Sequence, residues 1–330
     1  MDTNAIGLDI GGANLKLATA RGTAKSRSFA LWKHPEKLAA ELRDFAGDFE
    51  PDVPIGVTMT GELCDCFRTK REGVRHIVKA TEEAFRGRSI RYWTTDGQFV
   101  DAEAGCEQPI KVAAANWHAQ ATFVGRFAPQ GFALLMDMGS TTFDIVPVRN
   151  GVPVPVCKTD AQRLVTGELL YFGCRRTPLA ALLKDACAEL FSTVHDVHVL
   201  AGRSPEEPHN TDTADGRPMT REYAWERVAR MLGFDREMPH ADAVVTRACD
   251  TVMAVQKQRW TQAVTRVQSL RNDRATTVLV SGSGAFVTRE WVAEMTPTPQ
   301  VIQLSETLGE LVSHAACAYA VAVLRAEHLR

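Results

Sequence analysis

The sequence predicts an α/β fold of two similar lobes that face each other across a cleft. In residues 132–144, an apolar run with the character of a buried strand ends in Asp137 and is followed by a glycine and three hydroxyl residues. Residues 6–16 repeat this order of strand, Asp-x-Gly turn and second strand at the amino terminus. Two copies that each open about half of the chain indicate an internal duplication. The chain has no linker rich in glycine and serine, so we expect the halves to meet directly.

Composition and charge restrict the class of protein. The chain has 330 residues, enough for about two domains. A formal net charge of −2 argues against a general nucleic-acid or membrane-surface role. We find no amino-terminal signal peptide and no apolar run near the ~20 residues of a membrane span. The eight cysteines lack a framework spacing and are expected to remain thiols, so we expect a cytoplasmic protein of enzyme size.

Hydrophobic periodicity predicts the elements of the first half. Residues 5–10 and 14–20 are expected to form two strands of a hairpin, whereas a Rossmann glycine loop would open a helix at this point. The further predicted elements are a strand over 28–32, a helix over 35–45, a strand over 54–60, a helix ending near 85, a strand over 90–94 and a helix over 112–127.

The second half is predicted in the same way. Strands over 132–136, 143–148 and 152–156 include a hairpin with its turn at Asn150-Gly151. Residues 204–218 are strongly polar and form a candidate lid loop. The remaining predictions are helices over 220–232 and 242–270, a strand over 277–280, a glycine-rich loop over 281–285 and a helix over 305–329.

Several side chains at predicted strand ends have the chemistry of a phosphate site. Asp9 and Asp137 can each hold a hydrated Mg²⁺, and the turn glycines can present backbone N–H groups to phosphate oxygens. Glu62 and Asp65 follow a strand end and could face a ligand, although a solvated loop explains them equally well. The adjacent pair Arg175-Arg176 could bind an anion or lie in a solvated basic turn.

Two other pairs are better explained without function. The thiols of Cys64 and Cys66 have no second pair and make a poor zinc site, so we expect them to be half-buried. His195 and His198 lack a third ligand at suitable spacing and are expected to be a surface feature.

The two Asp-x-Gly turns and Ser281-Gly-Ser-Gly-Ala285 resemble the two phosphate motifs and the adenosine motif of the actin/hexokinase/Hsp70 superfamily. This resemblance covers the chain in the expected order. It implies two ribonuclease-H-like lobes with mixed five-stranded sheets around a central cleft. The lobes would span residues 1–130 and 131–330, with an inserted loop and helix at 204–232 and a carboxy-terminal helix that packs back on the first lobe.

Longer stretches resemble the hydantoinase A/5-oxoprolinase-related branch, and within it a short subgroup of methanofuran-biosynthesis synthases linked to tetrahydromethanopterin-dependent C1 transfer. These stretches are residues 59–67, 69–74, 115–117, 137–144, 163–169 and 173–178. The resemblance implies a transferase that joins the phenol oxygen of γ-glutamyltyramine, or of a tyrosine analogue, to the CH₂ of an aminomethylfuran-methanol diphosphate. Pyrophosphate would be released and the aryl-alkyl ether of methanofuran (methylofuran) formed.

The resemblance also assigns expected roles to residues. The acids expected to hold the cofactor Mg²⁺ are Asp9, Asp137 and Asp144. Diphosphate binding is expected from Gly11, Gly12, Asn14, Lys16, Gly139, Ser140, Thr141, Arg175, Arg176, Gly282 and Gly284. The candidate bases are Glu62, Asp65 and Glu168. Substrate binding is expected from Lys70, Arg71, Asn116, Arg163 and Thr166. The partners would be small-molecule substrates and neither nucleic acid nor membrane, and an oligomer is compatible with the sequence.

Two alternatives stay open at this point. The phosphate motifs fit an ATP-dependent kinase or an oxoprolinase- or hydantoinase-like hydrolase of the same fold equally well. A protein from a different class, a nucleotide-binding sensor without chemistry, would also carry them.

Overall fold

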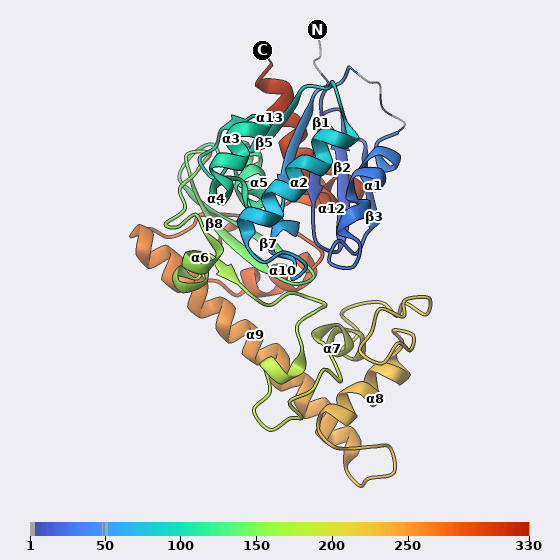
Figure 1. The fold of residues 1–330 in the computed structure, drawn as a ribbon. Coiled ribbons are helices and arrows are strands. Elements are labelled where there is room, and N and C mark those ends of the chain that lie inside the picture. Colours follow the sequence, from blue (N-terminus) through green and yellow to red (C-terminus); the bar gives the residue numbers. More distant parts are fainter. Residues whose placement is uncertain (1–3, 48, 50–51, 330) are drawn as a thin grey trace.

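The computed structural model describes residues 4–47, 49 and 52–329. Two β-sheets are separated by a central helical layer, and each has an outer helical layer on its other side (Figure 1). The amino- and carboxy-terminal ends lie at the same end of the molecule (Figure 1).

The first sheet has the strand order β3-β2-β1-β4-β5-β6. Its strands are β1 (Ile6–Ile10), β2 (Asn14–Thr19), β3 (Ala24–Ser28), β4 (Ile55–Met59), β5 (Ile90–Trp93) and β6 (Phe99–Val100). The second sheet has the order β10-β8-β7-β11-β12, with β9 paired to β8. Its strands are β7 (Phe132–Met138), β8 (Phe143–Arg149), β9 (Val152–Pro153), β10 (Leu169–Leu170), β11 (Thr277–Ser281) and β12 (Gln300–Gln303).

The two sheets have the same topology around their central strands. β1 pairs antiparallel with β2 and parallel with β4, and β7 pairs antiparallel with β8 and parallel with β11. This confirms the predicted duplication. The expected five strands per sheet are wrong for the described residues, because each sheet has six. The additional strands include β6 and β9, which are too short to give a periodic signal.

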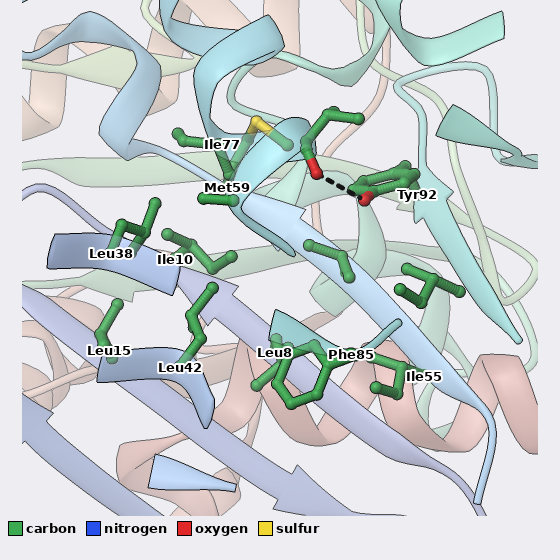
Figure 2. Close-up of a cluster of buried hydrophobic side chains, with 14 of the residues drawn as sticks. Leu8, Ile10, Leu15, Leu38, Leu42, Ile55, Met59, Ile77, Phe85 and Tyr92 are labelled. Atoms are coloured by element: carbon green, nitrogen blue, oxygen red, sulfur yellow. Dashed lines mark hydrogen bonds between the residues drawn. The ribbon is translucent and has the colours of Figure 1, made fainter. Parts of the chain in front are cut away.

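The alternation of apolar residues along the strands explains where the outer helices pack. Ile6, Leu8 and Ile10 of β1 point into a core with α1 (Leu38–Phe45) and α2 (Lys70–Ala84). Figure 2 shows Ile10 in this core close to Leu38 and Leu42 of α1, and Leu8 beside Phe85. On the second sheet, α9 (Ala241–Arg271) and α10 (Ala285–Ala293) cover the corresponding outer face.

The helices of the central layer pack against both sheets. α5 (Asn116–Val124) and α13 (Ala316–Glu327) share one buried cluster with residues of β5, β7, β8 and β11. α13 lies directly on β1, because a Cβ added to Gly7 would come within 1.9 Å of the Ala318 carbonyl oxygen. The face of β1 that carries Gly7 and Asp9 therefore points toward the central layer.

A helical extension (residues 179–252) projects from the second lobe (Figure 1). It consists of α7 (Val194–Leu200), α8 (Arg221–Met231) and the first half of α9, and it has its own buried cluster. The 31-residue α9 connects this extension to the body of the lobe. The cluster runs from Leu179 to Val252, so the extension is larger than the predicted 204–232.

The remaining helices connect these layers. They are η1 (Pro35–Lys37), η2 (Gly61–Leu63), α3 (Ala102–Glu107), α4 (Pro109–Val112), η3 (Gly125–Phe127), α6 (Asp160–Thr166), η4 (Leu179–Ala181), α11 (Leu304–Leu308) and α12 (Glu310–His314).

Four predicted elements are wrong in extent. The helix expected over 112–127 is interrupted at 113–115, between α4 and α5. The strand expected over 152–156 is β9, which ends at Pro153. Residues 29–32 form no strand: β3 covers Ala24–Ser28 and shares only Ser28 with the strand expected over 28–32, because Phe29 and Leu31 leave the sheet and turn into the core. The helix expected over 305–329 is split into α11, α12 and α13. Gly309 causes the first break, since its φ of +80° is outside the helical region.

Candidate active site

The two predicted phosphate turns have the same local structure. In the first turn, the Gly11 N–H donates to the Asn14 carbonyl at 3.0 Å. In the second turn, the Gly139 N–H donates to the Thr142 carbonyl at 2.8 Å. The strand register then places Lys16 opposite Asp9 on the first hairpin and Asp144 opposite Asp137 on the second.

The two strand-end aspartates face the central layer from opposite sheets. Asp9 is 7% exposed, and its buried Oδ1 has no hydrogen-bond partner. Burial raises the pKa of Asp9, and the nearby Lys16 ammonium lowers it in part. Burial, together with Asp144, raises the pKa of Asp137 to about 6, and Lys16 opposes this change. The Lys16 ammonium therefore lies within electrostatic reach of both acids.

Three residues of other elements complete the surroundings of Asp137. The Gln120 amide of α5 donates to Ser281 Oγ at 2.7 Å, and both side chains hydrogen-bond to Asp137. The Cys317 thiol at the start of α13 lies 3.5 Å from Gln120 Oε1 and donates to it. Burial and the charges of Asp9 and Asp137 raise the pKa of this thiol. The amide of Asn116, a predicted substrate residue, lies 3.8 Å from the same sulfur.

The glycine-rich loop after β11 closes directly on β7. Gly282 has a φ of +87°, and a Cβ there would lie 2.2 Å from the Met138 carbonyl oxygen and 2.4 Å from Asp137 Oδ1. Gly284 is packed equally closely against the Met138 side chain. These two predicted residues therefore allow the loop to approach the acid, which no larger residue would permit.

The arginine turn lies on the second glycine turn. The backbone N–H groups of Arg175 and Arg176 donate to the Ser140 carbonyl at 3.1 Å and 2.8 Å. The Arg175 guanidinium makes a two-point ion pair with Glu207, at 3.1 Å and 2.5 Å. The more exposed Arg176 pairs with Asp212 at 3.4 Å. Both predicted anion-binding arginines are thus beside the second turn, and each is paired with an acid of the 204–218 loop.

Glu62 is the most unusual candidate base. It is 1% exposed, and neither carboxylate oxygen makes a hydrogen bond of good geometry with a described residue, although the backbone N–H groups of Glu62 and Ala114 are near enough to stabilise its charge. Desolvation by burial raises the pKa of Glu62 to about 7. Its position in η2 is adjacent to the first glycine turn, because a Cβ on Gly61 would lie 3.2 Å from the Gly11 carbonyl. A buried acid that titrates near neutral pH beside a candidate ligand site has the properties of a general base.

α6 connects the second lobe to the Glu62 side of the first. Lys70 pairs with Asp160 at 2.6 Å, and both charges act on Glu62. Arg163 is 1% exposed, lies 3.9 Å from the centre of the Trp117 ring, and donates to Asp144 at 2.8 Å. This pairing occupies an Asp144 oxygen that we predicted to face a metal.

The hydrogen bonds around Glu168 and Thr166 indicate a structural role. The Glu168 carboxylate is fully buried and accepts hydrogen bonds from the N–H groups of Val156 and Cys157 and from the Thr166 hydroxyl, at 2.6 to 3.0 Å. These bonds hold the chain that leads into α6. They favour a structural role over the predicted roles in proton transfer and substrate binding, because three of about four lone-pair positions of the carboxylate are already used.

The remaining predicted residues differ in how exposed they are. The Ser140 and Thr141 hydroxyls lie 3.4 Å apart within the second turn. Gly12 lies beside Cys64, whose sulfur would be 2.7 Å from an added Cβ. The exposed members of the predicted set are Asn14, Asp65, Arg71 and Arg176. Cys64 and Cys66 are partly buried free thiols, as predicted.

One prediction about histidines is wrong. His195 and His198 do not form a surface feature, because they are 4% and 0% exposed. They belong to α7, which packs into the helical extension, and the short polar pattern in this segment concealed that burial.

The acid pair fits a hydrated cation better than a fully protein-bound one. Among the described residues, no three His, Cys, Asp or Glu side chains are grouped so that they could hold a metal ion. Mg²⁺ commonly needs only one or two carboxylates, with water and phosphate oxygens as the other ligands. The unpartnered oxygen of Asp9, and Asp137 within reach of the same Lys16 ammonium, fit that pattern.

The paired sheets, the duplicated glycine turns and the closely packed third loop define a two-lobed protein of the actin/hexokinase/Hsp70 fold class. A nucleotide-free acetone carboxylase structure shares this fold, with a TM-score of 0.53 at 10% identity, over 96% of this chain and 70% of that one. The model of the hydantoinase/oxoprolinase family matches residues 55–328, so the chain belongs to that family.

Two named relatives are more specific. The chain is 31% identical, over 98% of both chains, to the (4-{4-[2-(gamma-L-glutamylamino)ethyl]phenoxymethyl}furan-2-yl)methanamine synthase of Methanocaldococcus jannaschii. It is 28% identical to the protein of the same name from Methanococcus vannielii, over 58% of this chain and 89% of that one. Across the part of the chain that the structure describes, no helix is both long enough and apolar enough to cross a membrane.

Proposed function

We propose that this protein is a transferase of methanofuran biosynthesis that forms an aryl-alkyl ether. The observation that carries the proposal is the full-length similarity to the synthase of Methanocaldococcus jannaschii. The name of that relative describes a phenoxymethyl-furan product, in which a phenol oxygen is joined to a furan CH₂. The acceptor would be γ-glutamyltyramine or a tyrosine analogue, and the donor an aminomethylfuran-methanol diphosphate.

The proposed reaction is a substitution at the CH₂ group. The phenol oxygen forms the new C–O bond, and the bond from carbon to the diphosphate oxygen breaks, with its electron pair leaving on pyrophosphate. A phenol has an unperturbed pKa of about 10 and benefits from a base. Glu62 accepts the phenolic proton, since its carboxylate is desolvated and no other described side chain donates a hydrogen bond to it.

The charge that develops on the leaving group requires cations. The charge of Lys16 acts on both strand-end acids, and Arg175 and Arg176 border the second glycine turn. Asp9 and Asp137 would hold Mg²⁺, which when bound neutralises diphosphate oxygens. A phosphate must come close to the backbone to be bound by it. The two turns at Gly11 and at Gly139 and Ser140 allow this close approach.

The test is to incubate the full chain with both substrates and Mg²⁺ in the absence of nucleotide. We expect the ether by mass spectrometry, with pyrophosphate formed in equal amount. A strict requirement for ATP, with ADP and phosphate formed at each turnover, would contradict the proposal.

The family match supports one alternative. An ATP-dependent kinase, or a hydrolase of the hydantoinase/oxoprolinase type, would use the same glycine turns for the phosphates of ATP. ATP turnover that depends on a small substrate, without ether formation, would identify it.

A further inference from the structure

The two arginines beside the second glycine turn share one unexpected feature. Arg175 is paired with Glu207 and Arg176 with Asp212, and both acids belong to the polar 204–218 loop. The Arg175–Glu207 contact uses both terminal guanidinium nitrogens and both carboxylate oxygens. This two-point geometry is also the one in which a guanidinium binds a phosphate group.

The acids are held in place by the loop itself. Glu207 accepts a hydrogen bond from the Asn210 amide at 2.6 Å, and its N–H donates to the Met219 carbonyl at 2.8 Å. The hydrogen bonds from Arg175 keep the pKa of Glu207 below its usual value, so the acid is charged at neutral pH.

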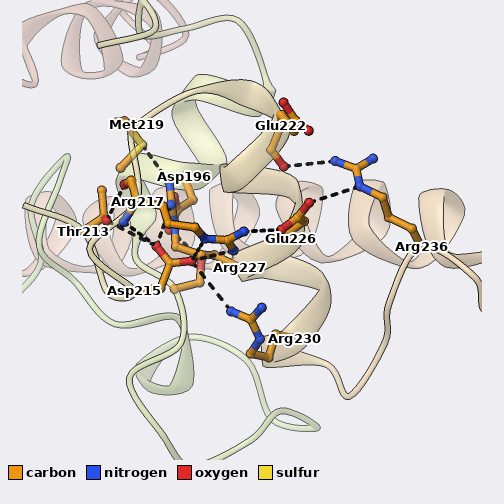
Figure 3. Close-up of polar contacts among 11 residues, drawn as sticks. Asp196, Thr213, Asp215, Arg217, Met219, Glu222, Glu226, Arg227, Arg230 and Arg236 are labelled. Atoms are coloured by element: carbon orange, nitrogen blue, oxygen red, sulfur yellow. Dashed lines mark hydrogen bonds and ion pairs between the residues drawn. The ribbon is translucent and has the colours of Figure 1, made fainter. Parts of the chain in front are cut away.

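The far side of the loop has an independent anchor. Figure 3 shows Asp215 among Arg217, Arg227 and Arg230, with Arg227 also bound to Asp196. Arg227 and Asp196 are 0% and 1% exposed, so this anchor is buried inside the helical extension. The side of the loop near the glycine turn, by contrast, contacts that turn through ion pairs at partly exposed arginines, and Asp212 is itself 86% exposed. The Glu207 N–H bond to the Met219 carbonyl lies within the extension and involves neither of these arginines.

We propose that Glu207 and Asp212 determine the anion selectivity of the arginine pair: they are internal counter-ions that a diphosphate displaces and a single phosphate does not. This inference rests on the diphosphate donor of the proposed function. A ligand with two phosphoryl groups can replace both acids, whereas a single phosphate can replace one and leaves the other pair closed. On displacement, the 204–218 loop is released on the arginine side and stays anchored at Asp215.

The first test measures binding of sodium pyrophosphate and sodium phosphate to the full chain, with MgCl₂ present, by calorimetry. The variant Glu207→Gln should bind pyrophosphate roughly fivefold more tightly than the original chain, because a partly exposed ion pair no longer has to be broken. Glu207→Gln with Asp212→Asn should bind phosphate more tightly as well, and so lose selectivity. Glu206→Gln is the matched control, since this neighbouring acid contacts the Arg221 N–H and not the arginine pair.

The second test uses the unaltered chain and so does not depend on the folding of any variant. Hydrogen exchange at the Glu207 and Asn210 amides should become faster with pyrophosphate, while the Arg217 amide, bonded to Asp215, should not change. Unchanged or weaker pyrophosphate binding by Glu207→Gln, or slower exchange in the loop, would overturn the selectivity role and leave the proposed function intact. Failure of every variant and of the original chain to bind pyrophosphate would overturn both.

Discussion

Burial of the Glu62 carboxylate has opposite consequences for chemistry and for stability. The same desolvation that raises its pKa to about 7 makes it a proton acceptor at neutral pH and makes its charged form costly. Since the pKa rises on folding, the folded protein binds this proton more tightly than the unfolded chain. Stability is therefore lost as pH rises from 4.5 through about 7.

The first prediction concerns activity. Glu62→Gln removes the base and should lower kcat by at least about 100-fold. In the original chain, kcat/KM should rise with pH and level off above about 7, and this limb should be absent in the variant. Steady-state kinetics from pH 5 to pH 9 would measure both effects. Asp65→Asn, at an exposed carboxylate in the same loop, is the control and should keep the limb.

The second prediction concerns stability of the same variant. Above pH 7, Glu62→Gln should increase the free energy of unfolding by up to roughly 3 kcal/mol, because the cost of the buried charge disappears. Below pH 4.5 the two proteins should be equally stable within error. Urea unfolding at both pH values would measure this difference. A variant that is less stable than the original at pH 8 would contradict the desolvation argument.

At the level of elements, the loop after β11 has its shape only because two glycines allow it. The third prediction is that Gly282→Ala costs about 3 kcal/mol or more in unfolding free energy, from left-handed strain and the displacement of Met138 and Asp137. Gly216→Ala is the control, since Gly216 also has a positive φ but no atom within 4 Å of its added Cβ. It should cost about 1 kcal/mol. Equal losses for the two variants would show that only backbone strain matters.

Elements with local signals could be predicted from the sequence. The first hairpin was predictable from the alternation after its Asp-x-Gly turn, and the turn at Asn150-Gly151 from its residue types, both of which have positive φ. β3 was not, since Ala-Lys-Ser-Arg-Ser is a polar edge strand without an apolar face. The buried cluster of the helical extension joins residues from three separate segments, which no local pattern relates.

The candidate site was predictable to the extent that its residues follow strand ends. Asp9, Asp137 and Glu62 were found in this way. Gln120 is a polar residue within an alanine-rich helix, a weak signal, and its partner Ser281 is 161 positions away. The pairing of Arg175 with Glu207 depends on where the extension folds back, so tertiary structure alone reveals it.

On the scale of the whole molecule, the lobes are joined through the central layer. The fourth prediction is that Gly7→Ala lowers the unfolding free energy by about 3 kcal/mol, since its Cβ would enter the backbone of α13 at Ala318 and Ala322. Urea unfolding monitored by circular dichroism would measure the change. Gly22→Ala, in the turn after β2, has no atom near its added Cβ and should lose only the strain energy of its positive φ. A loss at Gly7 no larger than at Gly22 would indicate that α13 can move away from β1 at little cost.

The position of α13 on β1 also has a consequence for synthesis of the chain. Residues 6–19 leave the ribosome about 300 residues before α13 does. At roughly 5–20 residues per second, that delay is on the order of 15–60 seconds. During this time the nascent first sheet has one face without its covering helix. Gly7 and Ala18 lie on that face, and their small size allows α13 to pack closely. Their small size also means that the uncovered face exposes little apolar surface to non-native contacts before α13 is synthesised.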